Sequence, residues 1–147
     1  MPDNNNSIYV TGRLYLSAYS KRKKKLWDAS GRNLVVNSGY DTVVRALTGS
    51  PGAHITQVAA GTNGSHTQVT DTQITDATVL NIQDVEYLQP NKVRFHFTVK
   101  HEDCIGMNIR EFGLITSDGQ LFSRKVLEGI EKTDSFCIVG VWEINVH

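Results

Sequence analysis

The chain has 147 residues, the length of one domain, and a domain of this size buries enough surface to fold without disulfide or metal staples. Its 15 basic residues equal its 15 acidic ones, which argues against a globally basic nucleic-acid binder and an acidic solvating tail. No apolar run approaches the roughly 20 residues of a membrane helix, and the polar N-terminus lacks the apolar core of a secretory signal. We expect a single domain over residues 1–147, with residues 1–7 as a flexible tail.

Two cysteines, Cys104 and Cys137, are too few for a disulfide framework. We expect both to be reduced thiols in the core.

The first predicted strand covers residues 8–18, where apolar and polar side chains alternate with period two. Its polar face carries Tyr9, Tyr15 and Tyr19, which either pack under a helix or form an intersubunit surface, since tyrosine is enriched at interfaces. A hairpin follows, in which residues 28–33 are the expected glycine-containing loop.

Five consecutive basic residues lie at the other end of that predicted hairpin: Lys21, Arg22, Lys23, Lys24 and Lys25. The rest of the chain has ten basic residues against fifteen acidic ones, so the charge is unevenly distributed. Such a molecule can stack head to tail or dock on another charged component. A solvated hairpin end and a partner-docking segment explain the run equally well.

Residues 37–49 predict the one helix, because apolar side chains recur at helical spacing: Tyr40, Val43, Val44 and Leu47. Ser38 is the expected N-cap, and Asp41 is placed to accept hydrogen bonds from the free amides. Gly49, followed by Pro51 and Gly52, ends the helix.

Residues 61–78 predict a long polar loop, a common place for binding. Strands are expected at 55–60, 79–88, 93–100, 105–115, from 121, and 136–146. The last is apolar on both faces, which predicts a central position in its sheet. Together these patterns predict a mainly β fold, either an antiparallel β-sandwich or a partly closed barrel, with one short amphipathic helix packed on it.

Candidate catalytic and metal-ligating residues are sparse. His96 and His101 precede Cys104, but their spacing matches no common zinc site. Four carboxylates could be paired as in a glycosidase: Asp71, Asp76, Asp84 and Glu86. The alternative is that they are surface residues that contribute only to solubility. The sequence has no phosphate-binding loop and no nucleophile motif. We expect no enzymatic activity, no metal and no cofactor.

Glu111 lies among apolar residues of a predicted strand, where a carboxylate must be paired or accept backbone amides. The adjacent Gly113 indicates a bulge or a close backbone approach. We interpret Glu111 as a structural acid, with amides near Gly113, Arg110 or Arg124 as its expected partners.

The order of several motifs resembles that in bacteriophage tail and tail-fibre structural proteins. Residues 109–115 and 118–124 resemble an "I-x-E-x-G-L" strand and a "G-x-L-F-x-R" strand, followed by Lys132 and the apolar end Trp142 to Val146. Upstream, residues 33–39 resemble an "N-L-V-x-N-x-G" helix entry, and residues 55–63 resemble an "I-x-x-I-A-x-G-T-G" strand.

This resemblance implies a non-enzymatic component of a bacteriophage virion or tail-like particle, made in the bacterial host cytoplasm. The expected partners are further copies of the chain in a cyclic oligomer and other particle proteins. The expected contacts are the basic run and the three tyrosines, and neither membrane nor nucleic acid is an expected partner. The alternative is a carbohydrate-binding module that recognises a bacterial surface glycan through residues 61–78 and nearby aromatic side chains.

Overall fold

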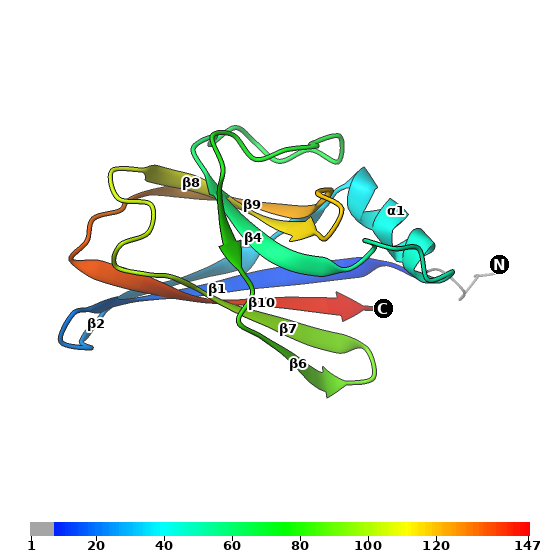
Figure 1. Cartoon of the computed structure of the whole chain (residues 1–147), viewed down its shortest axis with the longest axis horizontal. Helices are drawn as coiled ribbons and strands as arrows, with labels where there is room; N and C mark the ends of the chain where they lie inside the picture. Colours follow the sequence, from blue (N-terminus) through cyan, green and yellow to red (C-terminus); the bar gives the residue numbers. More distant parts are fainter. Residues whose placement is uncertain (1–7) are drawn as a thin grey trace.

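A computed structural model describes residues 8–147 as two five-stranded antiparallel sheets packed face to face (Figure 1). This confirms the predicted mainly β fold and identifies it as a β-sandwich with one short helix. The predicted tail, residues 1–7, lies outside the described residues.

We call the two sheets A and B. In spatial order, sheet A contains β2 (Lys25–Arg32), β1 (Val10–Ser20), β10 (Phe136–Val146), β7 (Lys92–Val99) and β6 (Asp84–Gln89). Sheet B contains β3 (Leu34–Val35), β9 (Leu121–Glu131), β8 (Asn108–Thr116), β4 (Ile55–Gly61) and β5 (Thr78–Asn81). The central position of β10 is confirmed, because β1 and β7 cover both of its edges.

The core lies between the sheets and follows from the period-two alternation of their strands. Phe97 of sheet A and Phe112 of sheet B are fully buried, and their ring centroids lie 5.7 Å apart. Trp142 is also fully buried and donates its indole N–H to the side-chain oxygen of Asn33. Aromatic side chains of this size bury 150–250 Å² each, so they dominate the core energetics.

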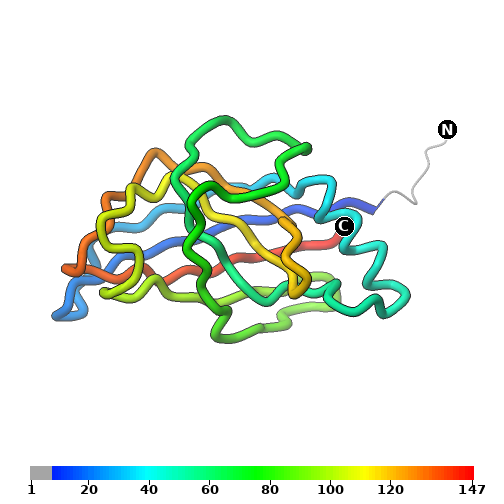
Figure 2. Tube along the Cα trace, turned by 45° about the horizontal axis from the view of Figure 1, so that its top comes forward, coloured from blue at the N-terminus to red at the C-terminus, as the bar shows by residue number. Residues whose placement is uncertain are grey.

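The outer faces of the two sheets differ. Over sheet B, the polar segment 62–77 forms a second layer, and a small buried cluster lies beneath it: Val36, Ala59, Ile74 and Leu121. The segment arches over β8 and β9, and α1 (Asn37–Ala46) lies at one end of the same sheet (Figures 1 and 2). Sheet A is open on its outer face, where Tyr15 and Val139 are 39% and 40% exposed. The sandwich therefore presents one covered sheet and one open sheet.

The predicted hairpin loop over residues 28–33 is wrong, because β2 runs through it and the turn is the basic run itself. Asp28 lies opposite Ser17, whose hydroxyl donates to the Asp28 carboxylate at 2.6 Å. β2 can contain residues that are typical of turns, such as Asp28 and Gly31, because it is an edge strand with one neighbouring strand and one solvated side.

Two other strand predictions need correction. The segment 79–88 forms two strands, β5 and β6, which belong to different sheets, so the chain crosses the sandwich between them. The strand expected from residue 105 begins at Asn108, because Cys104 and Gly106 have positive φ angles that turn the chain.

The helix forms as predicted, but its orientation and cap differ. The N-cap is Val36, and the Ser38 hydroxyl instead donates to the backbone carbonyl of Leu121. Gly39 and Thr42 face β9, while Asp41 pairs with Arg45 at 2.9 Å. A Cβ at Gly39 would lie 2.1 Å from the carbonyl oxygen of Phe122, so only glycine permits this close packing.

Candidate interaction sites

Tyr15 and Tyr19 lie on the outer face of β1, Tyr9 directly precedes that strand, and none of the three packs under the helix. Tyr9 is 53% exposed and stacks on the ring of His147, with centroids 4.7 Å apart. Tyr19 lies opposite Lys25, which places it beside the basic run. Tyr9 and Tyr19 thus mark opposite ends of β1.

The basic run forms the turn between β1 and β2, and all five of its side chains are exposed. Lys23 adopts a left-handed φ of 64°, and its amide donates to the carbonyl of Ser20 at 2.8 Å. Within this run, Lys25 pairs with Asp28 at 3.4 Å. Strand register places the loops 100–107 and 132–135, with Glu102, Asp103 and Asp134, at the same end of the sandwich as the basic turn.

Glu111 is fully buried on the outer side of sheet B and accepts three hydrogen bonds. Arg124 donates to one carboxylate oxygen at 2.7 Å, which confirms the expected arginine partner. The other oxygen accepts the backbone amides of Asn63 and Thr75, both at 2.9 Å. These amides belong to the covering segment and not to the surroundings of Gly113, so that part of the expectation is wrong.

Arg124 is 1% exposed and fixes the same segment from its other side. Its remaining N–H groups donate to the carbonyls of Asn63 and Ser65 and to the carboxylate of Asp71, at 2.8–3.1 Å. The side chain of Ile74 packs on Gly113, where a Cβ would lie 2.8 Å from it, so the glycine makes room for side chains and not for the bulge or close backbone approach that we expected. The predicted binding loop is therefore a fixed layer whose polar side chains point outward from a buried ion pair.

Most of the apolar stripe of α1 faces solvent, although Val43 packs against the core. Tyr40, Val44 and the adjoining Leu47 are 39%, 63% and 81% exposed. The Tyr40 hydroxyl donates to the carbonyl of Val10 at 3.4 Å, which places the stripe beside the start of β1. Since soluble domains rarely expose contiguous apolar side chains on one helix, this stripe is a candidate contact surface.

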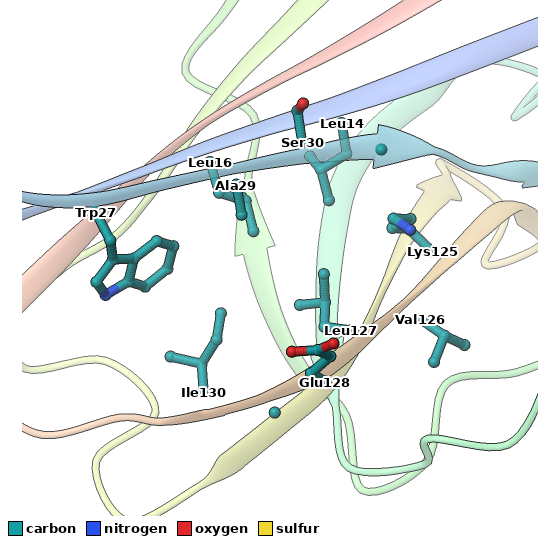
Figure 3. Close-up of a pocket in the computed structure, with 12 residues that line it drawn as sticks. Leu14, Leu16, Trp27, Ala29, Ser30, Lys125, Val126, Leu127, Glu128 and Ile130 are labelled. Atoms are coloured by element: carbon teal, nitrogen blue, oxygen red, sulfur yellow. The ribbon is translucent and has the colours of Figure 1, made fainter.

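An apolar groove of about 380 Å³ lies between β2, an edge strand of sheet A, and the part of β9 that β3 does not pair with. Figure 3 shows Trp27, Leu16 and Ala29 on one side of it, opposite Leu127 and Ile130. The only charged groups that line it are Lys125 and Glu128. The groove is therefore lined mainly by apolar side chains that come from both sheets.

Lys132 is a buried cation that sequence reasoning did not single out as a site. It is 1% exposed, and its ammonium donates to the carbonyls of His101 and Thr133 at 3.1 and 2.7 Å. The ammonium also lies 5.3 Å from the centroid of the Phe136 ring. Burial lowers the pKa of Lys132 below its usual value.

The remaining titratable candidates are distributed over the surface. His96 contacts Glu86 at 3.0 Å on the outer face of sheet A, and Asp71 is engaged by Arg124. In the described part of the chain, no three histidine, cysteine or acidic side chains are grouped as metal ligands. Cys104 and Cys137 are unpaired and half-buried, and Cys104 packs against the core as expected.

Comparison with models of protein families, with curated proteins and with solved structures found no match to this chain. Within residues 8–147, no helix is long and apolar enough to span a bilayer.

Proposed function

We propose that this chain is a non-enzymatic structural component of a bacteriophage virion or tail-like particle, which assembles in several copies and docks to other particle proteins. The observation that carries the proposal is the exposed stripe of Tyr40, Val44 and Leu47. Exposing these side chains to water is unfavourable by roughly 25 cal/mol per Å² of apolar surface, and a contact with another subunit removes that cost.

The basic run supports the same proposal. It lies at one end of β1, and the stripe lies beside the other end of this 11-residue strand. At about 3.3 Å per residue, the two surfaces are more than 30 Å apart. A contact between two different surfaces of identical copies is heterologous, and such contacts close into rings when the rotation allows it.

The motif order of residues 33–63 and 109–146 supports a particle context, because it resembles the order in bacteriophage tail and tail-fibre proteins. Direct evidence would come from purified particles of the source strain, separated by density and analysed by quantitative mass spectrometry. We expect the chain in the particle fraction at a fixed, multiple copy number per particle. Its absence from that fraction, with the chain found only in the soluble lysate, would contradict the proposal.

A further inference from the structure

A row of charged side chains crosses the open face of sheet A. Strand register places one such residue on each of the five strands, in the order Arg32, Arg13, Glu143, Arg94 and Glu86. Glu143 is only 8% exposed and pairs with Arg94 at 3.0 Å, so its charge is already balanced. Two positive charges therefore lie side by side at the β2 end of the row.

Arg13 and Arg32 are direct cross-strand partners, a position in which like charges are unfavourable. Among residues 8–147, neither guanidinium forms an ion pair. Arg13 donates one long hydrogen bond of 3.5 Å to Ser30 and lies 5.9 Å from the centroid of the Tyr15 ring. Each arginine carries five N–H donors, so most of the donors of this pair have no protein acceptor.

The two arginines border a hollow of about 380 Å³, whose other walls include Tyr9, Thr11, Asn145 and His147. Glu143 also lines it, with its carboxylate paired to Arg94. This volume is in the range of small-ligand sites. Tyr9 and His147 form a stacked aromatic pair, and Thr11 Oγ1 lies 2.8 Å from His147 Nε2. The hollow thus combines unpaired guanidinium groups with an aromatic surface, a hydroxyl and a side-chain amide.

We propose that this hollow is a binding site for an acidic saccharide, in which Arg13 and Arg32 bind the carboxylate of a uronic-acid or similar sugar. Planar guanidinium groups match a carboxylate by paired hydrogen bonds. The ring of Tyr9 supplies an apolar surface for the sugar face, and Asn145 offers both a donor and an acceptor for hydroxyl groups. We favour a sugar over an acidic protein surface as the ligand. Both would contact the arginines, but only a sugar ring would also occupy the hollow beside them.

The test uses calorimetric titration at low salt of the wild-type chain with a glucuronate-containing oligosaccharide. The matched probe is the same oligosaccharide with each carboxylate reduced to an alcohol. We expect the acidic probe to bind at least about tenfold more tightly, and the Arg13→Gln/Arg32→Gln variant to lose about tenfold or more of that affinity. A Lys24→Gln/Lys25→Gln variant has the same change in net charge at the far end of β1, and we expect it to bind like the wild type.

Equal binding of the two probes, equal losses in both variants, or no binding at all would overturn the proposal. Tighter binding of a glutamate-rich peptide than of the acidic sugar would assign the hollow to a protein partner instead. Thermal unfolding separates a lost site from a lost fold: Arg32→Gln should leave the melting temperature unchanged or raise it, because it removes a like-charge contact. A Val44→Glu/Leu47→Glu variant should keep sugar binding, so this test is independent of the assembly proposed above.

Discussion

At the scale of single residues, Glu111 has the most consequential position in the molecule. Its carboxylate is fully buried, yet each oxygen is engaged by a donor from a different part of the chain. A buried charge is tolerated only when such partners replace its lost hydration. Glu111 and Arg124 therefore stabilise the fold by fixing the layer that covers sheet B.

Glu111→Gln should lower the free energy of unfolding by about 3 kcal/mol, because it leaves Arg124 buried without its main counter-charge. The side-chain NH₂ group of glutamine would also face Arg124 or the backbone amides of Asn63 and Thr75, which are themselves donors. Urea unfolding measures the loss, and hydrogen exchange locates it: the amides of Asn63 and Thr75 should lose protection first.

Arg110→Gln is the matched control, since Arg110 is the exposed neighbour on the same strand. Its effect should stay within about 0.5 kcal/mol. Normal stability of Glu111→Gln together with abolished binding of a partner or ligand would show that the acid is a functional site, contrary to our interpretation.

Lys132 is the second buried charge, and its contacts are carbonyl oxygens and an aromatic ring. Because burial lowers its pKa in the folded state, the unfolded chain binds more protons between that lowered value and the ordinary lysine pKa of about 10.4. The free energy of unfolding contributed by this group therefore rises with pH across that window.

We expect the wild-type chain to gain stability relative to Lys132→Met as the pH increases from neutral toward about 10.4. Urea unfolding of both chains at matched pH values measures this difference, in which the other titrating groups cancel. A difference that is constant with pH, or that falls as the pH rises, would show that the pKa of Lys132 is not lowered by folding.

At the scale of elements, α1 shows what a sequence pattern can and cannot determine. The 3.6-residue period correctly predicts the helix, but Gly39 and Thr42 decide which face packs on β9. That choice depends on a close contact with the carbonyl of Phe122, which no local pattern encodes. Tyr40, Val44 and Leu47 are consequently left exposed, which the sequence pattern alone did not predict.

The site around Glu111 was likewise predictable from the sequence only in part. Its apolar neighbours predict burial and Arg124 is among its expected partners, because those constraints are local or chemical. The amides of Asn63 and Thr75 lie 48 and 36 positions away along the chain, with no periodic signal to connect them to Glu111. Only the path of the covering segment over sheet B brings them together.

The turn between β1 and β2 carries a prediction about assembly. Replacing Lys23, Lys24 and Lys25 by glutamine should leave the fold intact, because exposed charges contribute little to stability. It should weaken self-association, and the effect should be larger at low salt, where screening is least. Light scattering at two salt concentrations measures this, with Lys92→Gln at the opposite end of sheet A as the control.

If the wild type and the triple variant associate equally well at every salt concentration, the basic turn is simply exposed to solvent and has no docking role. A loss of association that is equal in Lys92→Gln would indicate a general charge effect instead.

At the scale of the whole molecule, the two ends and two faces of the sandwich present different surfaces. Sheet B is covered by its own chain, sheet A is open, the basic turn lies at one end of β1, and the apolar stripe of α1 lies beside the other. Because the proposed assembly uses two different surfaces of each copy, we expect it to be heterologous and closed and not an isologous dimer.

The most direct test of this account is the sedimentation of the purified chain over a wide concentration range at physiological salt, beside Val44→Glu/Leu47→Glu. Both side chains are mainly exposed, so the variant should fold normally. We expect the wild type to form a discrete oligomer at high concentration and the variant to remain a monomer. A wild-type chain that stays monomeric at every concentration, or a variant that associates equally well, would contradict the account.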